Sequence, residues 1–525
     1  MHSLTQACLA VGKLASANKP SYQRHQPEQT LLYQLVQQHF PAFLDHQAAE
    51  GRSLPDYVQQ EFSDFLRCGR LEHGFLRVRC ESCHHEKLVA FSCKRRGFCP
   101  SCGARRMAET AALLADEVFP ARPIRQWVLT VPFPLRFLFA AYPELMSKVL
   151  GIVTRAISIH LARQAGFTKR AAPTGAVTLI QRFGSALNLN IHFHMLFLDG
   201  VYAQDTSDRY YFRRTGPPTV EQLHLLLHVI SERVARFLER RGILERDEGN
   251  SYLTLEGLEE DPLQDIHSHS VTYRIAVGPQ KGRKVFTLQT IPPQPQPATD
   301  NVRVAKLNGF SLHAGVAAHA HQRKKLERLC RYIARPAIAE RRLSLTSTGK
   351  VRYELKTPFR NGTTHVIFEP LDFIARLAAL VPKPRVNLTR FHGVFAPNSK
   401  HRALITPAGR GKGSKQANKD GDDRSFAEHH KAMSWAQRLK RVFNIDIETC
   451  EKCQGPVRII ACVEAPVAIK QILDHLASKE TSAEQATLPP GRAPPQLGLF
   501  DEIESLTGRK KGYQGGRQGR AWSAN

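Results

Sequence analysis

Long apolar runs are missing from this sequence, and so are several other familiar signals. No uninterrupted apolar stretch approaches the roughly 20 residues that a membrane-spanning helix needs. The opening residues, MHSLTQACLAVGKLASANK, lack the cationic segment and long apolar core of a secretory signal. The GK of STGKVRYE lacks the glycine-rich loop of a nucleotide-binding site. We therefore expect no membrane partner, no export and no use of ATP.

Acidic residues are scarce relative to basic ones. The 525 residues include 74 lysines and arginines but only 47 aspartates and glutamates, which leaves a formal net charge of +27. A chain of this length has room for several domains and a substantial core. Because a surplus of cations spread along the chain attracts polyanions, nucleic acid is the partner that the composition favours.

Cysteine is present but unevenly placed. Five of the 11 cysteines lie between Cys80 and Cys102. In a long chain without an export signal, clustered cysteines hold a metal more often than they form disulfides. The pattern therefore indicates metal binding and a reducing, cytoplasmic location.

The cysteine block contains two Cys-x-x-Cys pairs. Cys80 and Cys83 form the first, Cys99 and Cys102 form the second, and the segment between them has the length typical of four-cysteine zinc sites. Thiolates suit zinc, and a closed tetrahedral site stabilises a small fold that has little core of its own. We therefore expect these four cysteines to bind one structural zinc ion, with Cys93 as an alternative for one ligand.

Cations border this predicted zinc ribbon. Such a rim is typical of a DNA-contacting surface, because each cation can neutralise a phosphate. The alternative is a purely structural zinc whose basic rim is only solvated. The cations predicted to contact DNA are Lys94, Arg95, Arg96, Arg105 and Arg106.

A further cysteine pair lies near the end of the chain. The segment TCEKCQGPVRIIACVEAP contains Cys450 and Cys453, and Cys462 is the one additional cysteine nearby. No fourth ligand is evident. A second metal site and ordinary packing of reduced cysteines therefore both stay open for this segment.

The apolar pattern indicates an α+β arrangement without internal repeats. Strand-like runs such as AVTLIQRFG and KVRYELKT alternate with amphipathic stretches such as TVEQLHLLLHVISERVARFLERRG. The divisions that we predict are a helical N-terminal region at 1–67, a zinc ribbon at 68–112, a mixed domain at 120–402 with a loop-rich insertion at about 245–300, a basic linker at 403–432, a second cysteine-containing module at 433–475 and a disordered tail at 476–525.

Two histidines interrupt the apolar run NIHFHMLFLDGVY. Alternate residues of a strand face the same side, so His192 and His194 would point one way while Phe193, Met195 and Phe197 point the other. Two imidazoles on one face of a stiff strand can form half of a metal site. The alternative is a pair of partly buried histidines that hydrogen-bond to the backbone.

A tyrosine lies on a basic helix that Pro336 ends or kinks. Nearby positive charge favours the phenolate form of a tyrosine and attracts a phosphate. Taken alone, the pattern favours an amphipathic tyrosine at the edge of a core. The cations that surround Tyr332 are Lys325, Arg328, Arg331 and Arg335.

Three of these segments follow one another in a specific order. They are FSCKRRGFCPSCG in the ribbon, QRFGSALNLNIHFHMLFLDGVY around the histidines and RYIARPAIA at the tyrosine. Together they resemble rolling-circle transposases of the His-hydrophobic-His (HUH) type, and most of all the insertion-sequence-91 (IS91) family and its common-region relatives. The resemblance implies a bacterial protein, cytoplasmic and associated with the nucleoid, that acts on DNA in transposition.

The resemblance also implies a fold and a metal site. The fold would be α+β, an HUH-endonuclease-like antiparallel sheet flanked by helices and preceded by the cysteine zinc ribbon. His192 and His194 would lie on the central strand and bind magnesium or manganese. Gln181, in a run that can pair with the histidine strand, is the expected third ligand, with Asn188 and Asn190 as rivals.

By the same resemblance, Tyr332 would be the nucleophile. It would attack single-stranded DNA and leave a 5′-phosphotyrosine and a free 3′-OH, so that the strand can be rejoined. Arg328, Arg331 and Arg335 would bind the DNA. Some family members carry two tyrosines four residues apart, but here Arg328 occupies the position four before Tyr332, so the chain looks like a single-tyrosine variant. Tyr353, in a strand-like run, is the alternative nucleophile.

Other functions share parts of this pattern. A plasmid replication initiator or relaxase would use the same chemistry, whereas a zinc-dependent DNA-binding regulator would use none. A transposase built on clustered acids is less favoured because no carboxylate trio stands out. Metal-dependent nicking of single-stranded DNA separates the regulator from the HUH enzymes.

Overall fold

The structure is a computed structural model that describes residues 26–247, 250–254, 261–293, 303–409, 437, 441–442 and 448–480. The predicted basic linker lies outside the described residues from 410 on, and the predicted tail lies outside them from 481 on. Residues 476–480 are the end of a helix, which corrects the predicted start of the tail.

Helices and strands alternate along the chain much as the apolar patterns predict. The helices are η1 Pro27–Gln29, α1 Leu31–Ala49, α2 Asp56–Arg67, η2 Leu71–His73, α3 Pro100–Ala112, η3 Leu113–Val118, α4 Phe133–Ala141, α5 Pro143–Gln164, α6 Val220–Glu239, α7 Gln264–Val271, α8 Arg323–Ile333, η4 Glu340–Arg342, α9 Pro370–Leu380, α10 Arg402–Ile405 and α12 Pro466–Glu480. The strands are β1 Phe75–Cys80, β2 Glu86–Ala90, β3 Ile124–Thr130, β4 Gly175–Phe183, β5 Leu189–Leu198, β6 Gly200–Gln204, β7 Tyr210–Arg214, β8 Leu244–Asp247, β9 Asn250–Leu253, β10 Phe286–Gln289, β11 Val304–Leu307, β12 Phe310–Ala318, β13 Leu343–Leu345, β14 Val351–Glu354, β15 Thr363–Phe368, β16 Thr389–Gly393 and β17 Val457–Val463.

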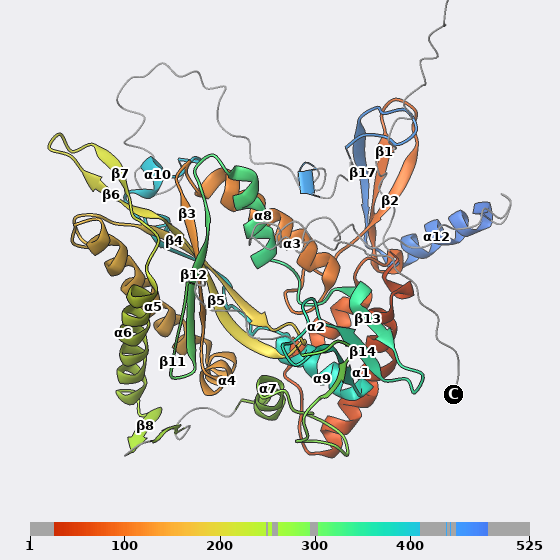
Figure 1. Ribbon diagram of the computed structural model, residues 1–525. Coiled ribbons are helices and arrows are strands. Elements are labelled where there is room, and N and C mark those ends of the chain that lie inside the picture. The colour runs from red at the N-terminus through yellow and green to blue at the C-terminus, as the bar shows by residue number, and fades with distance from the viewer. Residues whose placement is uncertain are drawn as a thin grey trace, which may run out of the picture.

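A six-stranded antiparallel sheet forms the centre of the protein. Its strand order is β11-β12-β3-β5-β4-β16, and every neighbouring pair is antiparallel. The strand with the two histidines, β5, therefore lies between β3 and β4 near the middle of the sheet (Figure 1). This confirms the predicted α+β class with an antiparallel sheet flanked by helices.

Different helices cover the two faces of this sheet. Phe193, Met195 and Phe197 of β5 point into the larger apolar core, on the side of α4, α5 and α6 (Figure 1). Leu196 and Leu198 point into a second core, which contains the apolar side of α8 and the π-helical turn η3. The alternation predicted for the histidine strand is therefore confirmed.

Helix α5 is the one helix of the described residues that is long and apolar enough to cross a membrane by length and composition. The sequence analysis did not single it out because Lys148 and Arg155 interrupt its apolar run. Of its most apolar window, 56% is buried inside the protein, where Met146, Val149 and Val153 join the larger core. The composition of α5 is therefore that of a core helix packed under the sheet.

A small three-stranded sheet projects from the body of the protein (Figure 1). Its order is β17-β1-β2, and β1 pairs antiparallel with both neighbours. The predicted separate module at 433–475 is thus wrong in its described part, since β17 completes the N-terminal ribbon. The physical reason is that the hairpin β1–β2 leaves one edge of β1 open for pairing.

The segment predicted as a loop-rich insertion, about 245–300, contains regular structure in its described part. It forms the hairpin β8–β9, helix α7 and strand β10. The ring of His267 on α7 lies 2.8 Å from the carboxylate of Asp261, and both side chains are buried. The prediction missed α7 because its 8 residues are too few to show a clear helical period.

Helices α1 and α2 lie in the region predicted to be helical at the N-terminus. Thr30 caps α1 by accepting a hydrogen bond of 3.2 Å from the Tyr33 N–H. The ring of Phe62 on α2 stacks on Phe40 of α1, with centroids 4.2 Å apart, and contacts Phe98 of the ribbon at 4.7 Å. These aromatic contacts join the N-terminal helices to the base of the ribbon.

Candidate functional site

The two histidines of β5 converge on each other. Their Nε2 atoms lie 3.1 Å apart. Each Nδ1 atom has a partner behind it: that of His192 lies 2.8 Å from the backbone oxygen of Asn190, and that of His194 lies 2.8 Å from the side-chain amide of Gln126. The Nε2 atoms therefore meet at one point, as two ligands of one ion do.

Hydrogen bonding and burial keep these rings neutral. A carbonyl oxygen only accepts, so His192 carries its proton on Nδ1 and a lone pair on Nε2. Burial lowers the pKa of His192 to about 4, and the charge of Arg335 acts in the same direction. Burial also lowers the pKa of His194, with contributions from His192 and Arg335. Neutral imidazole is the form that binds a metal.

Gln126, on β3, is a site residue that the sequence analysis missed. It is 4% exposed, and it reaches His194 because β3 pairs with β5 with Val128 opposite His194. The side-chain nitrogen of Gln126 lies 2.8 Å from Nδ1 of His194 and donates to it, so His194 carries its proton on Nε2 and can donate it to the lone pair of His192. A 180° rotation of the amide would turn its oxygen towards Nδ1 and leave the lone pair of His194 on Nε2, where a metal binds. The available signal was a polar residue inside a strand-like apolar run.

The predicted third ligand lies beside the histidine pair. Gln181 of β4 is directly opposite His192 in the register of β4 and β5, and residues paired in this way point to the same face. Its side-chain nitrogen donates a hydrogen bond of 3.2 Å to the backbone oxygen of Ile333, the residue after Tyr332. Gln181 therefore connects the histidine strand to the end of the tyrosine helix.

The two rival ligands differ in position. Asn190 shares the face of His192 by strand alternation, and its side-chain oxygen, like that of Asn188, is buried without a hydrogen-bond partner among the described residues. Asn188 lies in the turn before β5, where its side-chain oxygen faces the α-carbon of Gly184 so closely that an added Cβ would lie 2.2 Å from it. Asn190 is therefore the stronger rival.

Tyr332 lies one residue before the end of α8. The guanidinium of Arg335 stacks over its ring at 4.4 Å from the centroid, and the ammonium of Lys356 lies 5.2 Å from the same centroid. Arg335 is also the cation whose charge lowers the pKa of both histidines, as described above. One arginine thus borders the tyrosine and the histidine pair together.

The alternative nucleophile is enclosed. Tyr353 on β14 is 1% exposed, and burial raises the pKa of its hydroxyl. Tyr332 is partly exposed and lies at the edge of the core that contains the apolar side of α8. Because a nucleophile must reach a DNA strand, the geometry favours Tyr332.

Several cations predicted to contact DNA have partners within the protein. Arg95 donates a hydrogen bond of 2.6 Å to Asp64, and buried Arg331 pairs with Glu327. These contacts hold the ribbon loop and the tyrosine helix in place. The positive charges of Arg95 and Arg331 are therefore partly neutralised by acidic side chains of the protein itself, which leaves less charge for bound DNA. Of the other predicted residues, Arg96 and Arg106 donate to backbone oxygens, Arg105 pairs with Glu109, and Lys94 is exposed.

The structure separates the four cysteines predicted to share one zinc. Cys80 and Cys83 lie at the tip of the hairpin β1–β2, whereas Cys99 and Cys102 lie at the start of α3, near its base. At roughly 3.3 Å per residue, the arms of this hairpin keep the two pairs on the order of 15–20 Å apart. The predicted grouping of these four residues is therefore corrected.

At the base of the hairpin, four cysteines do come together. This base cluster consists of Cys68, Cys93, Cys99 and Cys102, whose sulfurs all lie within 4.8 Å of one another. The Sγ atoms of Cys93 and Cys102 are 3.4 Å apart, and those of Cys68 and Cys99 are 3.7 Å apart. Cys93 was the predicted alternative ligand, but Cys68 was missed because it precedes the block, directly after α2.

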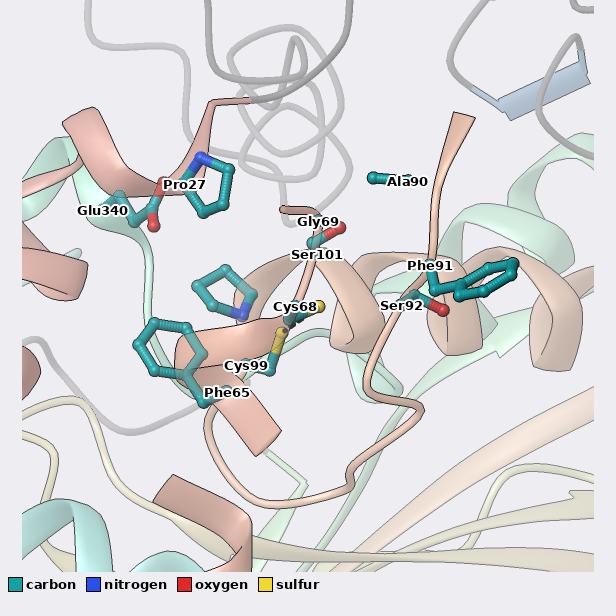
Figure 2. A pocket seen from close by; sticks show the side chains of 11 residues that line it. Pro27, Phe65, Cys68, Gly69, Ala90, Phe91, Ser92, Cys99, Ser101 and Glu340 are labelled. Atoms are coloured by element: carbon teal, nitrogen blue, oxygen red, sulfur yellow. Dashed lines mark hydrogen bonds between the residues drawn. The ribbon is translucent and has the colours of Figure 1, made fainter. Parts of the chain in front are cut away.

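A shallow pocket lies against the base cluster, and Figure 2 shows the side chains of Cys68 and Cys99 on one of its walls. Its apolar lining includes Phe65, Phe91 and Pro27, and Glu340 is its acidic residue. None of the histidines, Gln181 or Tyr332 lines it. The pocket therefore belongs to the cysteine region and is separate from the histidine centre.

A second group of four cysteines forms at the tip of the hairpin. This tip cluster consists of Cys80, Cys83, Cys450 and Cys453, whose sulfurs also lie within 4.8 Å of one another. The two predicted pairs Cys80–Cys83 and Cys450–Cys453 thus meet each other, and the ligands missing from the C-terminal pair are supplied by the N-terminal ribbon. Cys462 stays outside both clusters.

Comparison with known protein families finds matches to two parts of the chain. A family model described as "Transposase zinc-binding domain", built for IS91 transposases, matches residues 35–131. A second, described as "Putative transposase", matches residues 175–403 and so covers β4, β5 and α8. No curated protein and no solved structure matches the chain significantly.

The fold and these matches define a DNA-binding transposase with a structural zinc domain before its central sheet. More specifically, the two matches are those of an IS91-family transposase that carries an N-terminal zinc-binding domain. The base cluster lies entirely within the matched zinc-binding region, and its four thiolates suit a closed structural zinc site.

Proposed function

We propose that this transposase cleaves and rejoins single-stranded DNA in rolling-circle transposition, with Tyr332 as the nucleophile and a 5′-phosphotyrosine as the intermediate. One observation above all supports this: the Nε2 atoms of His192 and His194 converge to 3.1 Å, and Gln181 hydrogen-bonds from beside this pair to the end of the tyrosine helix. A metal centre and a nucleophile on adjacent elements are what strand cleavage requires.

The side chains at this centre fit a divalent ion. With the amide of Gln126 turned so that its oxygen accepts from His194, the converging Nε2 atoms of two neutral imidazoles would offer two ligands to a cation. The buried oxygen of Asn190, which has no hydrogen-bond partner among the described residues, lies on the same strand. His192, His194 and the oxygen of Gln181 would hold magnesium or manganese, with Asn190 as the rival third ligand. When bound, the ion would polarise the scissile phosphate and stabilise charge on the leaving oxygen.

The protein itself positions the nucleophile and the phosphate. The hydrogen bond from Gln181 to the Ile333 oxygen holds the end of α8 against β4, so the phenol of Tyr332 stays beside the sheet. Arg335 and Lys356, both within 5.2 Å of the Tyr332 ring centre, supply positive charge where a phosphate approaches.

The cleavage step balances without an added reactant. The hydroxyl of Tyr332 loses its proton to solvent, its oxygen forms a bond to phosphorus, and the bond from phosphorus to the 3′ oxygen breaks. The 3′ oxygen takes up a proton and becomes a free 3′-OH. Because the phosphotyrosine keeps the energy of the phosphodiester, attack by another 3′-OH rejoins DNA and releases the tyrosine.

The presence of one tyrosine on this helix sets the order of events. Arg328 occupies the position four residues before Tyr332, where a second tyrosine would lie. After one cleavage, Tyr332 is esterified and must be released by a 3′-OH before it can cleave again. A second cleavage before that release requires Tyr332 of another copy of the chain.

The test is formation of a covalent adduct with labelled single-stranded DNA from the flanks of the gene, in the presence of manganese. The wild type is expected to form a protein–DNA adduct, and Tyr332→Phe is expected to form none, although phenylalanine keeps the ring that stacks on Arg335. Tyr353→Phe, which removes a hydroxyl from the buried tyrosine, is the matched control and should keep the adduct.

Other outcomes lead to different functions. An adduct that is lost in Tyr353→Phe but kept in Tyr332→Phe would contradict the assignment of the nucleophile. DNA binding without any adduct would indicate a zinc-dependent regulator. Cleavage of plasmid origins in place of the element's own ends would indicate a replication initiator or relaxase.

A further inference from the structure

The turn at the tip of the ribbon hairpin has a specific hydrogen-bond pattern. The N–H of Cys80 donates to the oxygen of His85 at 2.9 Å, and the N–H of His84 donates to the oxygen of Cys80 at 3.1 Å. His84 has a positive φ of 56°. The N–H of Cys83 points at the sulfur of Cys80, 3.5 Å away, so this turn presents both sulfurs on one side.

A second turn, far along the chain, repeats this pattern. The N–H of Cys450 donates to the oxygen of Gly455 at 2.8 Å, and the N–H of Gln454 donates to the oxygen of Cys450 at 2.9 Å. Gln454 has a positive φ of 62°. The two turns therefore share the same bonds at the same offsets from the first cysteine.

Each turn directs a backbone N–H at the sulfur of its first cysteine. The N–H of Cys83 lies 3.5 Å from the sulfur of Cys80. The N–H of Cys453 hydrogen-bonds in the same way to the sulfur of Cys450. Backbone N–H groups directed at a cysteine sulfur favour its charged form, which is the form that binds a metal.

The two turns face each other at close range. The Sγ atoms of Cys80 and Cys453 are 3.4 Å apart, and those of Cys83 and Cys450 are 3.5 Å apart. Gly455 lies close to the first turn, since a Cβ there would lie 2.4 Å from the hydroxyl of Ser82. The pairing of β17 with β1, with Val457 opposite Cys80, fixes this approach.

We propose that Cys80, Cys83, Cys450 and Cys453 bind one zinc ion, distinct from that of the base cluster, which joins the C-terminal strand β17 and helix α12 to the N-terminal ribbon. Each turn supplies two ligands, and the site exists only when both turns are present. The whole protein then holds two zinc ions, one at each end of the hairpin.

The distances fit a metal better than disulfide bonds. In a tetrahedral site with zinc–sulfur bonds of about 2.3 Å, neighbouring sulfurs are about 3.8 Å apart, whereas a disulfide brings them to about 2.05 Å. The four sulfurs lie within 4.8 Å of one another, and the cysteines are unpaired. A small three-stranded sheet with exposed Ile459 and Ile460 has little core of its own, which makes it a fold that a metal stabilises.

Metal content tests this inference. Purified wild-type protein should contain two zinc ions per chain, and the double variant Cys450→Ser, Cys453→Ser should contain one. Cys462→Ser is the matched control, because this exposed cysteine lies on the same strand β17 but outside the cluster, and it should keep two. When cobalt replaces zinc, the double variant should show about half of the absorption that tetrahedral cobalt–thiolate sites give in the wild type.

Hydrogen exchange supplies a second readout that does not depend on metal counting. In the double variant, the amides of β17 should exchange faster than in the wild type, while those of β5 should be unchanged. Two zinc ions in the double variant would overturn the assignment, as would a single zinc in the wild type. If the wild type held one zinc ion and its mass were lower than that of the fully reduced chain by two hydrogens for each pair of sulfurs, the tip cluster would contain disulfides and no zinc. None of these results depends on the tyrosine chemistry.

Discussion

The histidine centre and the cysteine ribbon of this transposase are assembled in opposite ways. The centre takes His192 and His194 from one strand, and Gln126 and Gln181 from the two strands that pair with it. The ribbon joins Cys80 to Cys453, which are 373 positions apart. Strand alternation alone places the histidines together, whereas only the pairing of β17 with β1 places these cysteines together.

The difference shows which patterns can be trusted in a sequence. Neighbours on one strand share a face in any fold that keeps the strand, so His192 and His194 were correctly placed. Two Cys-x-x-Cys pairs with a suitable spacing do not have to share a metal, because the hairpin between them can hold them apart. The segment between the pair that begins with Cys80 and the pair that ends with Cys102 suggested one zinc site. In the structure this segment runs from the tip of the hairpin to its base, and a different cysteine cluster lies at each end.

The largest effect is expected at the histidine centre. His192→Ala or His194→Ala should lower manganese-dependent cleavage of single-stranded DNA by about 10³-fold, which corresponds to about 4 kcal/mol of transition-state stabilisation. His392→Gln is the matched control, since His392 is a partly buried histidine of the same sheet that hydrogen-bonds to Thr178 at 3.0 Å. Equal losses in all three variants would mean that the effect comes from folding and not from metal binding.

A smaller contrast is expected between the two cysteine clusters. The base cluster is part of the larger core, with Cys68, Cys99 and Cys102 all buried there, so Cys68→Ser should lower the main melting temperature by about 10 °C. Cys453→Ser, at the exposed tip, should lower it by less than about 3 °C. Cys330→Ser, a buried cysteine outside both clusters, controls for loss of the thiol alone. A larger shift from Cys453→Ser would reverse this contrast.

A positioning role for Gln126 gives a still smaller effect. Gln126→Leu removes the group behind His194 and should raise the manganese concentration needed for half-maximal cleavage by about 10-fold or more. Gln126→Glu should keep or lower the wild-type manganese requirement, because a carboxylate can only accept from Nδ1 and so leaves the lone pair of His194 on Nε2. If both variants kept the wild-type manganese requirement and changed only the unfolding midpoint, Gln126 would be a packing residue and nothing more.

The smallest expected effect is on stability at mildly acid pH. The pKa of His192 is about 4 in the folded protein, below its ordinary value of 6.5. Between these values the unfolded chain binds more protons than the folded one, so stability falls as the pH drops from 6.5 towards 4. In buffer without added magnesium or manganese, the wild type should lose on the order of 1 kcal/mol more than His192→Asn between pH 7 and pH 5, measured by urea unfolding. Equal losses would show that His192 is not held neutral.

Much of the fold could be predicted from short-range pattern. The strands around Gln181 and His194, the helix that ends before Pro336 and the N-terminal helices all appear where apolar spacing places them. Helix α7 could not be predicted, because its stability comes from contacts such as that of buried His267 with Asp261 and not from its own period. Apolar spacing therefore predicts long helices and strands correctly. It does not predict a short helix whose stability comes from tertiary contacts.

At the candidate site, the same limit separates what was predicted from what was missed. His192, His194, Gln181 and Tyr332 were named from the sequence, and the structure brings Gln181 to both the histidine strand and the tyrosine helix. Gln126 was missed, because which strand lies on the other side of β5 is decided by pairing across the sheet.

By itself, the sequence determined the α+β class, the shared face of His192 and His194, and the presence of cysteine pairs suited to zinc. These features depend on residues that lie close together in the sequence, and their spacing stays the same however the rest of the chain folds. Only the tertiary structure decided which cysteines share a cluster, since Cys68 and Cys93 meet at the base of a hairpin while Cys80 and Cys450 meet at its tip. The physical reason is that metal ligands must converge in space within a few ångströms, and that convergence depends on which strands pair.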